Sequence, residues 1–388
     1  MNQNSKRAGQ YVRQPAHYAA FIPEQLPPDP PIAWDDELHT LLSRADRALG
    51  RLDGSIQTLP DADLFVFMYV RKEAVLSSQI EGTQSSLNDL LEAEASINDT
   101  RHPSDVDEVL NYVDAMNHGL ARLGELPVSV RLIREIHHRL LNGVRGNQAS
   151  PGELRRSQNW IGPGGSSLNE AIFVPPPPHD VERLLSDLEK FIHASDRLPP
   201  LVKIGLIHAQ FETIHPFLDG NGRVGRLLIT FLLCEAEILI KPVLYLSYYF
   251  KRHRTRYYEL LQAVRDRGEW EEWIKFFLEG VAVVSLEATE TARAIVARRE
   301  ADRKLITDGF GRGAGSGLRI LESLYRTPFI SVSQAAERLG ITFQAARNLI
   351  QRFVDADLLV EITGQERYRV YQYAPYVRLF SDPDRPQM

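Results

Sequence analysis

Residues 215–226 read His-Pro-Phe-Leu-Asp-Gly-Asn-Gly-Arg-Val-Gly-Arg, and the apolar spacing on both sides of them predicts two helices. The glycines at 220 and 222 allow the backbone to approach an anion and to turn its N–H groups toward it. A helix that begins near Asn221 adds its positive N-terminal end at the same point. The segment therefore predicts a loop that binds phosphate.

The side chains of this segment suit chemistry on phosphates. Arg223 and Arg226 are three residues apart, so they share one side of a helical turn and can each fork onto a phosphate. Asp219 can hold Mg²⁺ between phosphate groups, and His215 can accept a proton from an attacking hydroxyl near neutral pH. Each feature alone is usually structural, but their combination favours phosphate transfer. The spacing does not fit a Walker A loop, which needs GxxxxGK[ST].

The segment resembles the signature of the Fic family, His-x-Phe-x-Asp/Glu-Gly-Asn-Gly-Arg-x-x-Arg, at every specified position, and the resemblance covers roughly residues 10–300. It implies a mainly α Fic-type helical bundle that transfers AMP from ATP to Ser, Thr or Tyr hydroxyls of target proteins and of itself. His215 would be the general base, Asp219 would bind Mg²⁺, and Phe217 would anchor the loop in the core. The ATP phosphates would be held by residues of the loop: Gly220, Asn221, Gly222, Arg223, Val224, Gly225 and Arg226.

Residues 157–178 (SQNWIGPGGSSLNEAIFVPPPP) interrupt the helical pattern and predict a small hairpin closed by GPGGSS. The resemblance implies that this hairpin is the family's flap, which aligns the target backbone by strand addition. Its expected contacts are Ala171, Ile172 and Phe173. A surface hairpin without a role is the alternative. Tyr257 and Tyr258 resemble an adenine-side position, although helical tyrosines are more often part of a core.

The sequence Ser-Ser-Gln-Ile-Glu-Gly, from Ser77, closes a predicted helix at 61–80. Ser77 and Glu81 share a helix face, and Gly82 suits a helix end. A carboxylate is unfavourable at a helix C-terminus, so a buried Glu81 needs a cationic partner. The resemblance implies that Ser/Thr-x-x-x-Glu-Gly/Asn is an inhibitory motif in which Glu81 pairs with Arg226 and withholds it from the γ-phosphate. Glu81 can also position a water that removes AMP from modified targets, and the sequence leaves both directions open.

Composition shifts and the family resemblance together predict four regions of the chain. They are an N-terminal arm and helical region with the inhibitory helix (1–100), a catalytic core (101–300), a linker (301–316) and a winged-helix domain (317–388). The first 32 residues are rich in proline and predict an extended arm. The sequence GFGRGAGSG predicts a flexible linker.

The C-terminal region predicts helices near 317–326, 331–338 and 342–356, followed by strands at 358–362 and 368–373, which is a winged-helix pattern. Several of its side chains can read bases or phosphates: Gln344, Arg347, Asn348, Gln351, Arg352, Arg367 and Arg369. From residue 301 onward, 12 basic and 10 acidic residues leave a net charge of only +2, so contact with DNA and contact with protein both stay open. A nucleotide-sensing, DNA-binding transcriptional regulator with a Fic-like domain is therefore the alternative function. Transfer of a different phosphate-containing group is a third.

Composition narrows the remaining choices. The net charge of −6 excludes a wholly basic nucleic-acid-binding molecule, and one cysteine, Cys234, excludes an internal disulfide. The N-terminus lacks the apolar core of a secretory signal, and charged residues interrupt the most apolar run, 227–246. We therefore expect a cytoplasmic protein without a membrane span. The family resemblance implies a homodimer.

Overall fold

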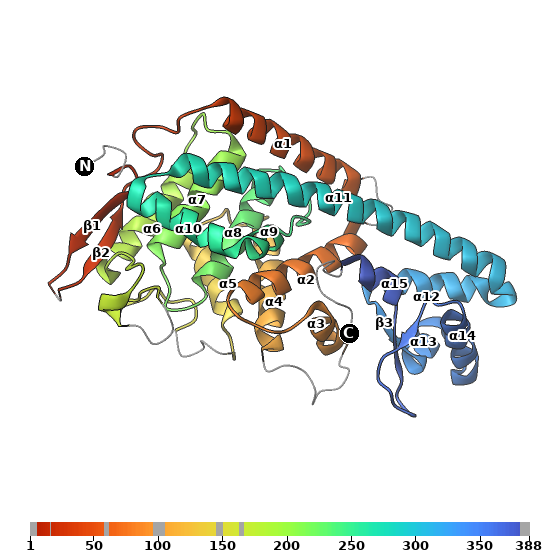
Figure 1. The fold of residues 1–388 in the computed structure, drawn as a ribbon. Helices are drawn as coiled ribbons and strands as arrows, with labels where there is room; N and C mark the ends of the chain where they lie inside the picture. Colours follow the sequence, from red (N-terminus) through yellow and green to blue (C-terminus); the bar gives the residue numbers. More distant parts are fainter. Residues whose placement is uncertain are drawn as a thin grey trace.

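A computed structural model describes residues 6–15, 17–57, 62–95, 105–144, 150–162 and 167–380. The chain is mostly helical, as predicted, and it is elongated (Figure 1). A large helical body occupies one end, and a smaller C-terminal domain occupies the other. The long helix α11 (Trp270–Gly309) runs from the first into the second.

The described part of the N-terminal arm is a hairpin rather than the expected extended segment. Strands β1 (Gly9–Arg13) and β2 (Ala19–Pro23) pair antiparallel. Phe21 is buried, its ring meets Tyr11 edge-on at 5.1 Å, and its N–H donates to the carbonyl of Val174. The prediction was wrong here because the prolines cluster only after β2, so they do not prevent strand pairing before it.

The helical body contains ten helices besides α11 in its described residues. These are α1 (Asp36–Gln57), α2 (Ala62–Ile80), α3 (Leu87–Glu94), α4 (Val106–Arg122), α5 (Val130–Leu140), α6 (Pro178–His193), α7 (Pro200–Ile214), α8 (Asn221–Glu235), α9 (Ser247–Arg252) and α10 (Arg254–Arg267). Helices α7 and α8 are buried on nearly every face, so they fix both ends of the loop between them, while Leu218 and Asp219 within it are exposed.

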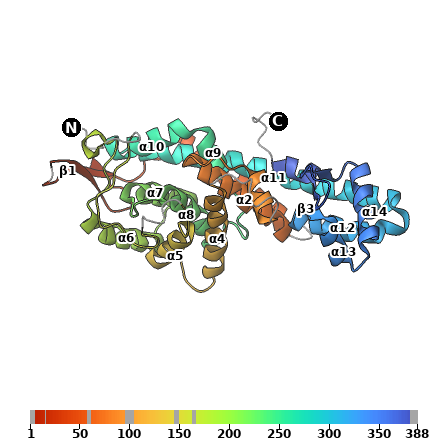
Figure 2. The ribbon, with the colours of Figure 1, turned by 90° about the horizontal axis from the view of Figure 1, so that it is seen from below.

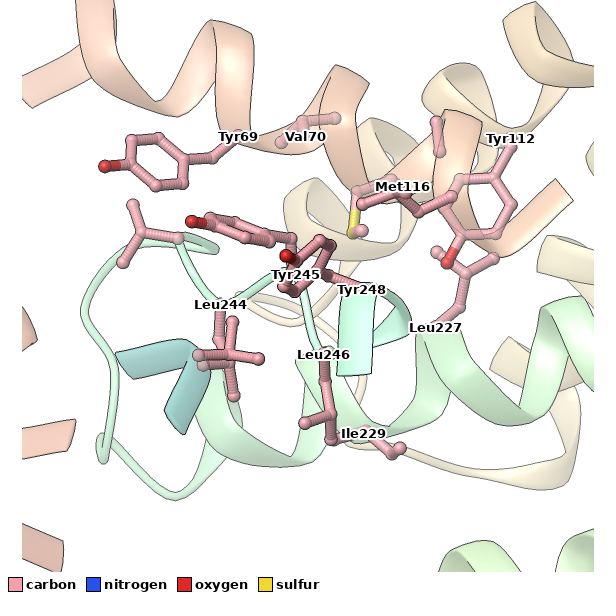
Figure 3. Packing of buried hydrophobic residues seen from close by; sticks show 14 of the residues in the cluster. Tyr69, Val70, Tyr112, Met116, Leu227, Ile229, Leu244, Tyr245, Leu246 and Tyr248 are labelled. Atoms are coloured by element: carbon pink, nitrogen blue, oxygen red, sulfur yellow. The ribbon is translucent and has the colours of Figure 1, made fainter. Parts of the chain in front are cut away.

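Helix α2 belongs to this body rather than to a separate N-terminal region, because it packs against α4 and α9. Figure 3 shows the packing, with Tyr69 and Val70 of α2 and Met116 of α4 near the segment that includes Tyr245. The ring of Tyr69 lies 5.6 Å from that of Tyr245, and its hydroxyl donates to the carbonyl of Ala288 in α11. The C-terminal half of α2 is thereby placed beside the loop at 215–226.

The C-terminal domain contains the expected helices and both expected strands. Its elements are α12 (Ala314–Arg326), β3 (Phe329–Ser331), α13 (Val332–Leu339), α14 (Phe343–Asp355), β4 (Val360–Glu361), β5 (Val370–Gln372), α15 (Ala374–Val377) and the 3₁₀ turn η5 (Arg378–Phe380). The strands are shorter than predicted, and β3 joins them in an antiparallel sheet of order β3-β5-β4.

The flexible linker expected at 301–316 is absent, since α11 continues to Gly309 and only the 3₁₀ turn η4 (Gly311–Gly313) separates it from α12. Phe310 is buried, and its ring meets Phe353 edge-on at 5.1 Å. The guanidinium of Arg352 donates to the carbonyl of Phe310 at 2.7 Å. These contacts overcome the flexibility that the glycines predict.

The C-terminal domain also touches the helical body beside α2 (Figure 2). The buried ring of Phe380 meets Tyr69 edge-on at 5.4 Å, and Gln372 donates to the side chain of Asn88 in α3 at 3.3 Å. In the described parts of the chain, no helix is long and apolar enough to cross a membrane.

Candidate active site

The loop between α7 and α8 turns sharply at both ends. His215 closes α7 in the left-handed conformation (φ 50°, ψ 61°), and Gly220 precedes α8 with φ 78°. Between them, the Asn221 side chain accepts a hydrogen bond from the N–H of Phe217 at 2.9 Å and donates to its carbonyl at 2.8 Å. The amide that the resemblance assigned to phosphate is therefore occupied in holding the loop.

Phe217 anchors the loop in the core of the helical body. Its ring is fully buried and stacks on the imidazole of His137 in α5, with 3.7 Å between centroids. His137 Nδ1 accepts from the N–H of Gly152 at 2.8 Å, so its Nε2 donates to the carbonyl of Asp219 at 3.0 Å. Burial lowers the pKa of His137 to about 4, which keeps this neutral tautomer. The expected role of Phe217 as a core anchor agrees with this packing.

His215 is half-buried at the C-terminus of α7. Burial lowers the pKa of its imidazole to about 3, and the positive charges of Arg265 and Arg155 add to that shift. Its buried Nδ1 accepts no hydrogen bond from the described residues. The ring is thus neutral at physiological pH and is able to accept a proton.

Arg223 and Asp219 lie on the outer side of the loop. Arg223 forms a buried ion pair with Glu108 of α4 at 2.9 Å, so its charge is already compensated inside the protein. The carboxylate of Asp219 is about half exposed, accepts from the N–H of Gly220 at 2.6 Å and lies 3.8 Å from Arg223. The described residues include no group of three His, Cys, Asp or Glu side chains that could hold a metal. Asp219 fits Mg²⁺ only as one carboxylate ligand, so phosphate oxygens and water would complete the shell.

Glu81 reaches from the end of α2 to the beginning of α8, as the sequence predicts. Its carboxylate accepts from the Arg226 guanidinium at 2.6 Å. Arg226 also donates to the hydroxyl of Ser77 at 2.8 Å and to the carbonyl of Ser77 at 3.0 Å. Arg226 is 2% exposed, and the Glu81 side chain is 33% exposed. Gly82 follows with φ 103° and allows the chain to turn away.

The Glu81 carboxylate also lies directly on the first turn of α8. A Cβ atom at Gly222 would come within 2.2 Å of Glu81 Oε1, so only glycine permits this approach. Burial alone would raise the pKa of Glu81, but the charge and hydrogen bond of Arg226 outweigh it and hold the pKa below its usual value. An ionised carboxylate therefore lies where the sequence predicts a phosphate.

Two family models match the chain: the Fic/DOC family N-terminal model covers residues 39–121, and the Fic/DOC family model covers residues 127–233. The chain belongs to the Fic/DOC family. Glu81 and Ser77 lie in the first matched region, and the whole loop from His215 to Arg226 lies in the second.

Curated relatives of this Fic protein include two named Protein adenylyltransferase Fic. That of Aedes aegypti is 31% identical over 207 residues, or 52% of this chain and 38% of the relative. That of Culex quinquefasciatus is 30% identical with the same coverage. The chain thus spans less than two fifths of the length of these curated relatives.

Solved structures show the same fold. A Fic family protein from Desulfovibrio desulfuricans G20 superposes with a TM-score of 0.59 at 19% identity, covering 88% of this chain and 97% of that one. A Fic domain containing signaling protein from Bacteroides thetaiotaomicron gives a TM-score of 0.50 at 18% identity, covering 66% and 95%. The Fic fold therefore extends beyond the two matched regions.

In its described residues, the segment expected to be the flap forms one antiparallel bridge, between Ile161 and Phe173. Residues 163–166, in the predicted closing turn, lie outside the described residues. Ala171 is partly exposed and Ile172 is 62% exposed, so both suit contact with a partner. Phe173 does not, because it is buried beneath the guanidinium of Arg265 at 3.8 Å. Its alternating position on the strand places it on the inner face.

The two tyrosines near the expected adenine side differ. Tyr257 is buried, and its hydroxyl pairs with His208 at 2.8 Å, so it is a core residue. Tyr258 is 41% exposed and, with Ile172, lines a hollow of about 600 Å³ between the flap and α10. Only Tyr258 is placed to meet a nucleotide or a target from this side.

Several buried polar residues around the loop escaped the sequence interpretation: His137, Arg155, His208, Glu212 and Arg265. Glu212 lies in the last turn of α7, where burial raises the pKa of its carboxyl to about 7. A Cβ at Gly225 would approach Glu212 Oε1 to 2.4 Å, so this glycine serves a close helix contact. Polar residues inside apolar stretches are the only signal of this group in the sequence.

Proposed function

We propose that this Fic protein transfers AMP from ATP to Ser, Thr or Tyr hydroxyls of target proteins and of itself. One observation supports this best. The Glu81 carboxylate lies at the N-terminus of α8 and forms an ion pair with Arg226. This place holds anionic oxygens through a guanidinium, a helix end and a glycine that admits close approach. The names of the curated relatives point to the same activity.

In the proposed reaction, neutral His215 accepts the proton of the target hydroxyl. The hydroxyl oxygen forms a bond to the α-phosphorus, the bond to the bridging oxygen breaks, and pyrophosphate leaves. The N–H groups at the start of α8 stabilise the charge that develops on the phosphate oxygens. Asp219 would hold Mg²⁺, which would neutralise phosphate charge. Arg223 is paired with Glu108 and Arg226 with Glu81, so in this proposal Arg226 becomes available to the nucleotide when Glu81 leaves it.

Regulation follows from the same contact. While Glu81 and Ser77 hold Arg226, the γ-phosphate lacks its partner and ATP does not bind productively, so the resting protein is inhibited. The same carboxylate would also serve removal of AMP by hydrolysis. It would orient a water toward the phosphorus of AMP on a modified target, the bond from that phosphorus to the protein oxygen would break, and free AMP would leave. A homodimer belongs to this proposal through the family resemblance, and the expected cytoplasmic location belongs to it as well.

Intact-mass analysis tests the reaction. Glu81→Gly, incubated with ATP and Mg²⁺, should gain the mass of AMP, and Glu81→Gly with His215→Ala should not. No gain in Glu81→Gly would contradict AMP transfer. A gain with another nucleotide alone would indicate transfer of a different group, and a gain without His215 would contradict its role as base.

The C-terminal domain supports a second function, binding of DNA by a winged helix. The outer face of α14 exposes Gln344, Arg347, Asn348 and Gln351, and Tyr368 of the wing is 89% exposed. Arg352 is also exposed on α14, but its guanidinium donates to the carbonyl of Phe310. A gel shift of the full chain with DNA fragments at low salt tests the regulator alternative. Absence of a shift, with AMP transfer intact, would favour protein docking.

A further inference from the structure

Two buried arginines, Arg155 and Arg265, converge on the C-terminal end of α7, directly before His215. They are 3% and 6% exposed. None of the described carboxylates forms an ion pair with either guanidinium. Burying a cation in this way is costly unless its donors are satisfied, and the carbonyls at a helix C-terminus satisfy them.

Arg155 joins the flap to the catalytic loop. Its Nε donates to the carbonyl of His215 at 2.8 Å, and its Nη2 donates to the carbonyl of Pro176 at 2.5 Å. Its own N–H donates to the carbonyl of Pro216 at 3.0 Å. A weaker contact of 3.5 Å reaches Ser157. One planar fork thus spans both ends of the segment 157–178 and the first residues of the loop.

Arg265 makes a second connection between the same two parts. Its Nη2 donates to the carbonyl of Glu212 at 3.2 Å and its Nε to the hydroxyl of Thr213 at 3.2 Å. The guanidinium lies 3.8 Å from the centroid of the Phe173 ring, a cation–π contact with the inner face of the flap.

We propose that Arg155 and Arg265 are positioning residues, which tie the flap to the end of α7 so that the acceptor segment and the base His215 keep a fixed geometry. This rests on the proposed function, in which the flap aligns the target and His215 takes its proton. The two positive charges also help burial to keep the His215 ring neutral, the state that accepts a proton. The same two side chains thereby hold the flap in position and help to keep His215 in its neutral form.

The first test does not depend on catalysis. In Arg155→Gln, hydrogen exchange of amides in 157–162 and 167–178 should accelerate about tenfold, with exchange in α1 and α11 unchanged. Arg155→Lys keeps the charge but not the planar fork, so it should give a smaller acceleration. Arg134→Gln is the matched control, because Arg134 also binds a backbone carbonyl, that of Gly152, but at the surface. Unchanged flap exchange in Arg155→Gln would overturn the proposal.

The second test separates positioning from general damage. In the Glu81→Gly background, Arg155→Gln and Arg265→Gln should each slow self-modification at saturating ATP by about tenfold to a hundredfold. The Kd for a fluorescent ATP analogue should change less than about twofold. Arg155→Lys should restore part of the rate. A Kd that weakens as much as the rate falls would overturn a positioning role. If Glu81→Gly itself transfers no AMP, the proposed function fails, while the exchange measurement still decides whether the flap is coupled.

Discussion

At the scale of single residues, Glu81 and Gly222 fit closely together, since a Cβ atom at residue 222 would come within 2.2 Å of the Glu81 carboxylate. A carboxylate enters the first turn of α8 because residue 222 lacks a side chain, and it stays there because Arg226 is buried behind it. The sequence showed each of these residues separately. The pairing of Glu81 with Arg226 came from the family resemblance, and the contact is present in the structure.

Charge and shape of Glu81 can be separated by substitution. Glu81→Gly removes both, whereas Glu81→Gln keeps the shape and loses the ion pair. We expect self-modification to rise in the order parent, Glu81→Gln, Glu81→Gly, with at least about tenfold between the extremes, since a buried charge pair is worth several kcal/mol. Initial rates with labelled ATP measure this. Glu182→Gln, on the exposed face of α6, is the control, and equal rates in parent and Glu81→Gly would refute inhibition.

Glu212 predicts a pH dependence of stability. Burial raises the pKa of its carboxyl to about 7, so the folded state holds this proton more tightly than the unfolded state. The contribution of this proton to the free energy of unfolding is complete below the pKa of the carboxyl in the unfolded chain, and it is lost as the pH rises toward 7. Glu212→Gln lacks this proton, so it should gain stability relative to the parent between about pH 4 and 7, by up to about 3 kcal/mol. Urea unfolding at several pH values measures the difference. A difference that does not change with pH would contradict this account.

At the scale of elements, the helix α2 acts as the arm that carries Glu81. Ser77 strengthens this arm, because it offers both a hydroxyl and a carbonyl to Arg226. The periodicity of apolar residues predicted this helix and most others, with ends within a few residues. It did not predict that α2 would pack against α4 and α9, since that depends on which faces meet in three dimensions.

Ser77→Ala should release the arm only partly. The substitution leaves a buried donor of Arg226 without its hydroxyl partner, which costs about 1–3 kcal/mol, while the bond to the carbonyl of residue 77 and the pair with Glu81 remain. Self-modification should therefore lie between those of the parent and Glu81→Gly. Ser78→Ala is the matched neighbour, because the buried Ser78 hydroxyl has no hydrogen-bond partner among the described residues. An effect as large as that of Glu81→Gly would show that the hydroxyl, not the carboxylate, carries the restraint.

Other elements show why local patterns fail. The glycines around residue 311 predict a flexible linker, but Phe310 inserts between α11 and α14 and makes the junction rigid. The prolines among the first 32 residues predict an extended arm, so the sequence did not predict the hairpin β1–β2. A buried aromatic ring stabilises each of these structures: Phe310 at the junction after α11, and Phe21 in the hairpin. The burial of each ring depends on partners far along the chain.

At the scale of the whole molecule, the C-terminal domain packs against α2, the helix that leads to Ser77 and Glu81. Phe380 meets Tyr69 two to three turns before Ser77 and Glu81, and α12 packs against α2. The sequence predicted the elements of this domain but not its contact with the helical body. Figure 1 shows that α11 supports both, so they share one continuous framework.

Phe380→Ala should loosen α2. Removing a buried aromatic ring leaves a cavity that costs about 3–5 kcal/mol, and here the cavity opens onto α2. We expect faster hydrogen exchange in 66–82 and a higher basal rate of self-modification. Phe343→Ala, in the same domain but 57% exposed on α14, should change neither. If exchange in α2 stays as in the parent, the domain does not support the inhibitory helix.

Under the proposed function, the carboxylate at the start of α8 makes Glu81 a competitor of nucleotide that is tethered by the chain itself. Because it belongs to the same chain, its effective concentration is set by the mobility of α2 and not by the cell. A ligand that needs Arg226 binds only the fraction of molecules in which Glu81 has left, and its apparent Kd rises by the inverse of that fraction. A ligand without a group for Arg226 is not affected. The site should therefore distinguish nucleotides by the number of their phosphates. Any partner that moves α2 should change the apparent Kd for nucleoside triphosphates and leave that for ligands without a group for Arg226 unchanged.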